Sequence, residues 1–152
     1  MAHWLTNNGK KLLLEGQWND AGATAIDIFL LVGAAVPAAI DTEAEIQDIN
    51  DVATFLALTG VDEPVFGGYV RKDLTRTNVT EDDTNNRANA DASNVTWTSA
   101  AAGESIYGAG WYDATTDTND TTRLLIGVIT WTAVPLNGSD FTLTITDLFR
   151  GV

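Results

Sequence analysis

The sequence predicts a mainly β fold: an antiparallel, jelly-roll-like β-sandwich of about seven strands with one helical insertion. Two observations lead to this prediction. Short apolar or alternating stretches, separated by polar turns, run along most of the chain. Only one stretch, residues 41–60, has apolar residues at helical spacing. With 152 residues and 45% hydrophobic residues, the chain is expected to form a single domain over residues 1–152.

Strands are expected on both sides of the helix in the first half of the chain. Residues 10–18 and 25–33 read as two strands joined by a polar turn. The second is almost continuously apolar, which is typical of a strand buried on both faces. Residues 67–79, which follow the helix, read as the next strand. Residues 1–9 are expected to form a flexible N-terminal arm.

The helical insertion carries its own start and stop signals. Thr42 and Glu45 have the spacing of a capping box at its beginning. The helix is expected to break near Asn50 and to stop at Gly60.

The second half of the chain is expected to consist of strands and loops. Residues 80–93 are polar and lack aromatic residues, which predicts an exposed loop. Gly108 and Gly110 indicate a bulge or close packing within a strand. Asn137 and Gly138 suit a hairpin turn that would join the last two strands. The strands predicted in this half are residues 94–99, 104–114, 123–134 and 141–147.

The charge and the apolar runs of the chain argue against nucleic-acid binding and against a membrane span. Asp and Glu number 21 against 8 Lys and Arg, which gives a formal net charge of -13. Because affinity for phosphate depends on Lys and Arg, nucleic acid is not an expected partner. A membrane span is not expected either, since the longest charge-free apolar run, residues 28–40, is interrupted by Gly33 and Pro37. Adaptation to a salty habitat is an alternative reason for the acidity.

Catalytic and metal-binding patterns are weak in this sequence. His3 is the one histidine, so a Ser-His-Asp triad would have to form around it. The stretch DTNDTT, residues 117–122, has oxygen ligands at alternate positions but lacks the glycine and glutamate of an EF-hand loop. An irregular calcium site there is the alternative to a solvated acidic loop. We therefore expect that the protein is not an enzyme, has no catalytic residues and binds neither a cofactor nor a metal.

Basic and aromatic residues indicate where partners would bind. Residues 65–76, VFGGYVRKDLTR, hold three of the eight basic residues but lack the Lys-Ser/Thr ending of a phosphate loop. They are expected to form sheet and interface. Trp4 would anchor the N-terminal arm on a neighbour, and exposed tryptophan and tyrosine near residues 113–120 would suit a glycan. The candidate interface residues are Trp4, Tyr69, Arg71, Arg76, Trp111 and Tyr112.

The order of segments resembles small structural proteins of tailed bacteriophages. The segments are LLLEGQW, AIDIFLLVGAAVP, EIQDINDVATF, GGYVRKDLT, VTWTS, IYGAGWYDA, RLLIGVITW and LNGSDFTLTITDLFRG. Such phage proteins carry an aromatic-Arg GY-x-R-x-x-L segment, which matches Tyr69, Arg71 and Leu74 here, and end in a Gly-Asp/Ser hairpin. The insertion TEDDTNNRANAD departs from their pattern.

The resemblance implies a capsid decoration (cement) protein on the virion surface. Its partners would be the major capsid protein and further copies of this chain, with a trimer as the expected oligomer. The implied role is to stabilise the head by bridging capsid subunits. The alternative is a host-recognition module of a tail or fibre that binds glycan, for which Trp111 and Tyr112 would be the site.

Overall fold

The computed structural model describes residues 2–19, 25–77, 79–84, 87–115, 119–145 and 149–151. Within these ranges the chain forms ten strands, three α-helices and two short 3-10 helices. The helical elements are α1 (Asn7–Leu14), η1 (Gln17–Asn19), η2 (Ala38–Ile40), α2 (Glu43–Ile46) and α3 (Val52–Leu56). The strands are β1 (Ala2–Leu5), β2 (Ile26–Val32), β3 (Lys72–Asp73), β4 (Thr80–Asp82), β5 (Arg87–Ala90), β6 (Val95–Trp97), β7 (Ser105–Asp113), β8 (Leu125–Pro135), β9 (Phe141–Leu143) and β10 (Phe149–Gly151).

The strands form one large antiparallel sheet and two small ones. The large sheet has the order β1-β8-β7-β2-β3, and the small sheets have the orders β10-β5-β4 and β6-β9. All strand pairs are antiparallel. The mainly β, antiparallel prediction is therefore confirmed, whereas the jelly-roll-like sandwich is not.

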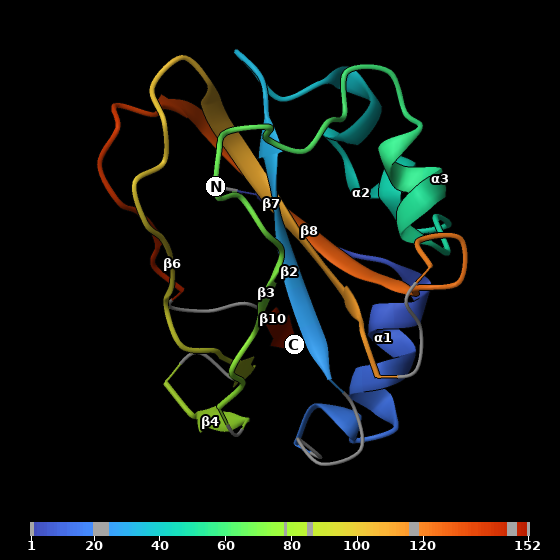
Figure 1. Cartoon of the computed structure of the whole chain (residues 1–152). Coiled ribbons are helices and arrows are strands. Elements are labelled where there is room, and N and C mark those ends of the chain that lie inside the picture. The colour runs from blue at the N-terminus through green and yellow to red at the C-terminus, as the bar shows by residue number, and fades with distance from the viewer. Residues whose placement is uncertain are drawn as a thin grey trace.

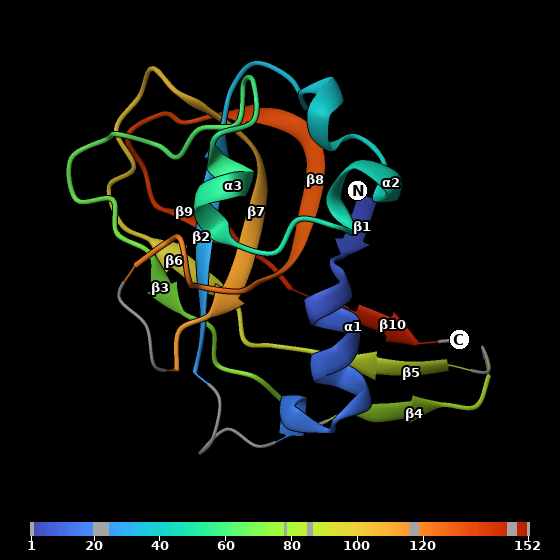
Figure 2. The same ribbon diagram turned by 90° about the vertical axis from the view of Figure 1, so that its right-hand side faces the viewer.

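Both faces of the large sheet are covered. In Figure 1, α2 and α3 lie on one side of the sheet and β6 lies on the other, and Figure 2 shows α3 across β7 and β2. Strand β2 contributes to both layers, since Ile28 and Leu30 belong to one buried cluster and Phe29 and Leu31 to the other. This confirms the prediction that β2 is buried on both faces.

The helical insertion follows the prediction closely. It consists of α2 and α3 with a break around Asn50, and the Glu45 carboxylate accepts a hydrogen bond from the Thr42 amide as a capping box requires. The insertion packs Ile46 and Phe55, both fully buried, against the sheet. Helix α3 ends at Leu56, a little before the predicted stop at Gly60.

The N-terminal residues differ from the prediction. The expected flexible arm over residues 1–9 is wrong for its described part, because β1 pairs with β8 and α1 begins at Asn7. Residues 10–18, predicted as a strand, continue α1 and then form η1. The buried Thr6 hydroxyl explains the helix start, since it accepts from the Gly9 amide and donates to Leu125 O.

Three further predictions are wrong, because these segments pair in other ways than expected. Residues 80–93 do not form a loop but hold β4 and β5, which pair with each other, and β5 also pairs with the C-terminal β10. Gly138 has the positive φ that a turn there needs, +89°, but β9 leaves β8 and pairs with β6. The predicted strand over residues 67–79 shortens to β3 and a single bridge between Arg76 and Ala92.

Close packing within β7 and alternation in β9 are confirmed. The register between β7 and β8 shifts between Ile106 and Gly108, which is the predicted bulge. A Cβ on Gly110 would lie 2.3 Å from Phe29 Cζ, so any larger residue there would have to displace the buried Phe29 ring. In β9, Leu143 is buried and Thr142 is exposed.

Candidate functional site

The candidate site is built around residues 63–71, which we call the 63–71 loop. It connects the helical insertion to β3 and passes along the open side of β2. At its centre Phe66 is buried, and its ring packs edge-on against Tyr69 with 5.4 Å between the ring centroids. The Tyr69 amide donates to Phe66 O, which closes the turn that contains the double glycine. The loop is therefore anchored by its own aromatic residues.

Tyr69 connects the loop to the sheet. Its hydroxyl accepts a hydrogen bond from the Leu30 amide at 3.0 Å and donates to Glu63 Oε1 at 2.7 Å. Burial raises the pKa of the Tyr69 hydroxyl, and the charge of Glu63 adds to the effect, so the hydroxyl stays protonated. Tyr69 thus satisfies a backbone donor of β2 at a position where β3 does not reach.

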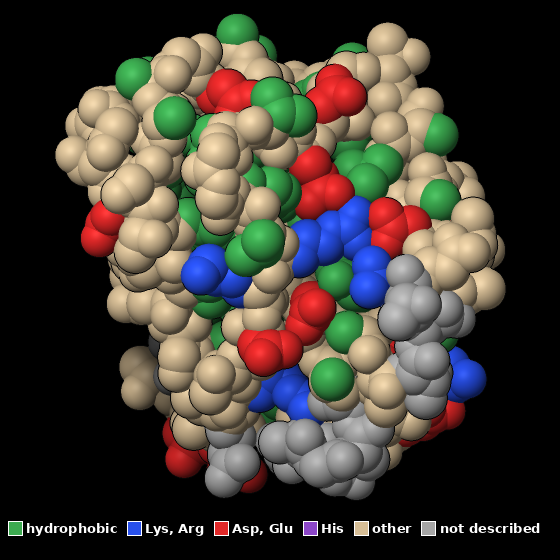
Figure 3. Space-filling model, viewed as in Figure 1, with side chains coloured by type: hydrophobic (Ala, Val, Ile, Leu, Met, Phe, Trp, Pro, Cys, Tyr) green, Lys and Arg blue, Asp and Glu red, His purple; other side chains and the backbone are tan. Residues whose placement is uncertain are grey.

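Arg71 holds the two ends of the site together. Its guanidinium pairs with Glu63 Oε2 and Asp120 Oδ1, each at 2.6 Å, and the side chain is only 17% exposed. The same group lies over two aromatic rings, 5.4 Å from the Phe29 centroid and 5.2 Å from that of Tyr112. Figure 3 shows basic and acidic side chains side by side across the middle of this face. Arg71, Glu63 and Asp120, which we call the clamp, thus hold the 63–71 loop to the turn that precedes β8.

The pKa shifts of Arg71 and Asp120 favour the charged forms of these two groups. Burial alone would disfavour the charged Arg71, but its hydrogen bonds to Asp120 and Glu63 outweigh burial and raise its pKa above the usual value. Hydrogen bonds from Arg71 and Arg123 lower the pKa of Asp120, against the opposing effect of burial. Arg123 contacts Asp120 Oδ1 at 2.8 Å. At neutral pH these charges are matched inside the site.

The clamped loop exposes two apolar side chains. Val65 is 87% exposed and Val70 is 59% exposed, although their backbones are held. The Val65 amide donates to Glu104 Oε1 at 3.1 Å, and Val70 O accepts from Trp97 Nε1 at 2.9 Å. The loop therefore presents apolar surface from a fixed backbone.

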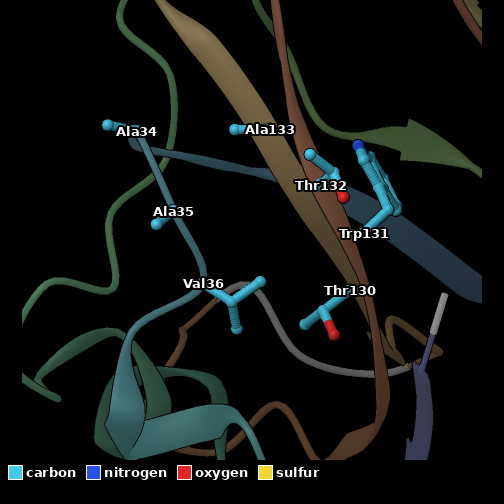
Figure 4. Close-up of a pocket in the computed structure, with 7 residues that line it drawn as sticks. All are labelled: Ala34, Ala35, Val36, Thr130, Trp131, Thr132 and Ala133. Carbon is cyan, nitrogen blue, oxygen red and sulfur yellow. The ribbon is translucent and has the colours of Figure 1, made fainter.

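An apolar groove lies at the same end of the sheet. The Val32 amide donates to Asp62 O, and the Leu136 amide donates to Glu104 O, so the ends of β2 and β8 adjoin the start of the loop. Figure 4 shows the groove between the segment after β2 and the second half of β8. It has a volume of about 450 Å³ and no charged residue in its lining, which consists of Ala34, Ala35, Val36, Thr130, Trp131, Thr132 and Ala133.

The structure brings three of the six sequence-predicted site residues together and separates the others. Tyr69, Arg71 and Tyr112 meet at the clamp. Arg76 lies elsewhere, with Nη1 donating to Gln17 O and its guanidinium 5.8 Å from the Trp18 ring. Trp4 is half-buried and packs against the cluster under α2 and α3 of its own chain. It does not project from a flexible arm.

Burial contradicts the glycan platform predicted at Trp111 and Tyr112. Trp111 is 0% exposed and Tyr112 is 1% exposed. Both lie on β7 in the middle of the large sheet, where the rings fill the core. Neither ring offers a face to a sugar.

Two members of the clamp, Glu63 and Asp120, were not among the interface residues predicted from the sequence, although Asp120 lies in the alternative calcium loop. Glu63 precedes Pro64 and Asp120 lies in a polar loop, so both look like solvated acids. Asp120 is 49 residues from Arg71 in the chain, and no local pattern connects them. Arg71, two residues after Tyr69, was the sequence feature that pointed to this site.

The described part of the chain offers little support for a metal site. The Asp120 carboxylate of the alternative calcium loop pairs with Arg71 and Arg123, and residues 117 and 118 of that loop lie outside the described ranges. Among the described residues, no group of three or more potential metal-ligating side chains is present. The described helices also include none with the length and apolar character needed to cross a membrane.

Comparisons with protein-family models, curated proteins and solved structures found no match for this chain.

Proposed function

We propose that this chain is a non-enzymatic structural protein of a tailed-phage virion, which decorates the capsid and bridges neighbouring major capsid protein subunits. The observation that supports the proposal most directly is the clamped 63–71 loop. Its backbone is tied to Glu104 and Trp97, while Val65 and Val70 point into solvent. A loop that is already ordered loses little conformational entropy on binding, which favours a docking role.

The charge distribution supports the same role. The net charge of -13 keeps the molecule soluble and opposes unspecific contacts. Apolar side chains on a fixed loop are then the part of the surface that gains most from burial against another protein. Bridging two shell subunits in this way would add buried area across their joint.

The proposed location and oligomeric state rest on the resemblance of the sequence to phage proteins. Decoration proteins of tailed phages are the class that the segment order resembles, which supports a position on the capsid surface and a symmetric homo-oligomer, with a trimer as our expectation. The tail or fibre alternative loses its predicted glycan site, because Trp111 and Tyr112 are buried.

Immunogold labelling of intact particles with an antibody to this chain tests the location. Label over the whole head is the expected result. Label restricted to a tail or fibre, or no label on particles, would overturn the decoration function.

The docking surface is tested with variants in a sedimentation assay. Purified chain is mixed with undecorated shells made from the major capsid protein of the same virus, and the bound fraction is measured. We expect Val65→Asp and Val70→Asp to weaken binding at least about tenfold, since each places a charge in an apolar contact. Leu14→Asp is the matched control, because Leu14 is 89% exposed on α1, away from the loop.

The two experiments separate the function from the surface. If the wild-type chain binds shells and Leu14→Asp alone weakens binding, the 63–71 loop is the wrong surface but the function stands. If the wild-type chain does not bind shells, the proposed function fails.

A further inference from the structure

Strand β3 is the most weakly attached strand of the large sheet. It has two residues, and its register places Asp73 opposite Asp27 and Lys72 opposite Ile28. One further hydrogen bond, from the Leu74 amide to Ile26 O at 2.8 Å, continues the attachment. So few backbone contacts make the side chains of the pair important for holding β3.

The pair that faces across this junction consists of two carboxylates. Directly opposite residues of an antiparallel pair lie on the same face, with Cβ atoms about 4.5–5.5 Å apart, and like charges there are destabilising. Asp27 is half-buried and Asp73 is exposed. Two carboxylates in this position are compatible when they share one proton, because the protonated group donates a hydrogen bond to the ionised one.

The groups around Asp27 come from three segments. From β7, the Tyr112 hydroxyl donates to Asp27 Oδ2 at 3.1 Å. From the turn before β8, Arg123 attracts the Asp27 carboxylate, and it also pairs with Asp120. From the strand side come Asp73 and its neighbour Lys72, whose side chain points to the opposite face because side chains alternate along a strand.

Together, the surrounding groups raise the pKa of Asp27. Burial raises the pKa of Asp27, and the hydrogen bond and charge of Asp73 add to it. Tyr112 and Arg123 act in the other direction without cancelling the increase. Arg71 does not reverse this balance, because its guanidinium is held by Glu63 and Asp120.

We propose that the Asp27–Asp73 carboxyl pair makes the attachment of β3 to β2 depend on pH, so that it is tighter in acid and loosens as the pair becomes fully ionised. When the pair shares a proton, it holds the segment that follows the 63–71 loop against β2. This inference does not depend on what that loop binds, so it stands or falls separately from the proposed function.

The sign follows from proton linkage. A carboxyl whose pKa is raised by folding binds more protons in the attached state than in the detached state. The attachment is therefore strongest below the ordinary aspartate value of 3.8 and weakens as the pH rises through the raised pKa.

Hydrogen exchange of single amides measures this attachment. The probe is the Leu74 amide, and the reference is the Ala114 amide, which donates to Ala25 O on the other edge of β2. Protection factors are determined by NMR between about pH 4 and pH 8 and corrected for the intrinsic exchange rate. We expect Leu74 protection to fall about fivefold over this range, while Ala114 protection stays constant.

The variant Asp73→Asn supplies the decisive comparison. It removes one charge from an exposed position and keeps the shape, so the fold is retained. Its Leu74 protection should fall clearly less with pH than in the wild-type chain, because only the effect of burial on the pKa of Asp27 remains. Asp48→Asn is the control, because Asp48 is an exposed acid whose contact is with Asn7, away from β3. It should keep the wild-type decline.

Three results would overturn the inference. The first is a constant Leu74 protection in the wild-type chain. The second is an equal decline of Leu74 and Ala114, which would indicate global loosening. The third is an undiminished decline in Asp73→Asn.

Discussion

At the residue scale, Arg71 makes the largest set of contacts in the candidate site. Its guanidinium serves two carboxylates and lies over two rings, and it connects segments that are far apart in the chain. A planar guanidinium is suited to this because it donates in a fixed fork, which a lysine ammonium cannot reproduce. The exposed Val65 and Val70 depend on it indirectly, since it closes the loop that carries them.

We predict that Arg71→Ala lowers the free energy of unfolding by about 2–3 kcal/mol, because it leaves Glu63 and Asp120 partly buried without their main partner. Urea denaturation followed by tryptophan fluorescence measures the loss. Lys11→Ala is the control, since Lys11 forms only an exposed 3.7 Å pair with Glu15 and should cost less than about 0.5 kcal/mol. Equal effects of the two substitutions would contradict the clamp.

At the element scale, α1 is defined by how closely it packs on β8. The helix begins at the buried Thr6 cap, and Leu12 is buried against the sheet. Gly9 permits the contact, because a Cβ at this position would lie 2.1 Å from the backbone oxygen of Ile126. The backbone of β8 cannot move aside as a flexible side chain would.

The packing of α1 predicts an inverted effect of a glycine substitution. Within an exposed helix, glycine to alanine stabilises by about 1 kcal/mol. We expect Gly9→Ala instead to destabilise the chain by about 1–3 kcal/mol, because α1 must shift away from β8. Gly67→Ala is the control, since a Cβ at Gly67 meets nothing within 4 Å. Thermal unfolding by circular dichroism compares the two, and a stabilised Gly9→Ala would show that α1 sits further from the sheet.

At the scale of the whole molecule, the excess of acidic residues is the dominant property. The net charge of -13 is distributed over 152 residues, and the clamp neutralises only a small part of it. Repulsion among exposed carboxylates opposes the compact state and is screened by salt. The partly buried pairs of Arg71 are screened much less.

We therefore predict that the melting temperature rises by about 3–6 °C between 10 mM and 200 mM salt and then levels off. Sodium chloride and choline chloride should give the same rise, because screening depends on ionic strength. Differential scanning calorimetry measures both. A flat or falling melting temperature would mean that attraction, and not repulsion, dominates the electrostatics of the fold.

The sequence alone was sufficient for features that depend on local patterns. The continuous apolar run of β2 indicated burial on both faces, and the spacing of Thr42 and Glu45 indicated a helix start. The alternation in residues 141–145 indicated which side chains face inward. These patterns are local because hydrophobic periodicity and capping involve residues a few positions apart.

Only the tertiary structure decided which distant segments meet. The run Leu12–Leu14 suits a strand as well as a helix, and the buried cap at Thr6 and contact with β8 select the helix. Strands β4 and β5 form beside the C-terminal β10, and Asp120 reaches Arg71 across 49 positions. Such contacts depend on where the folded chain returns to itself, because a backbone edge or a charge is satisfied by whichever partner arrives there, at any separation in the sequence.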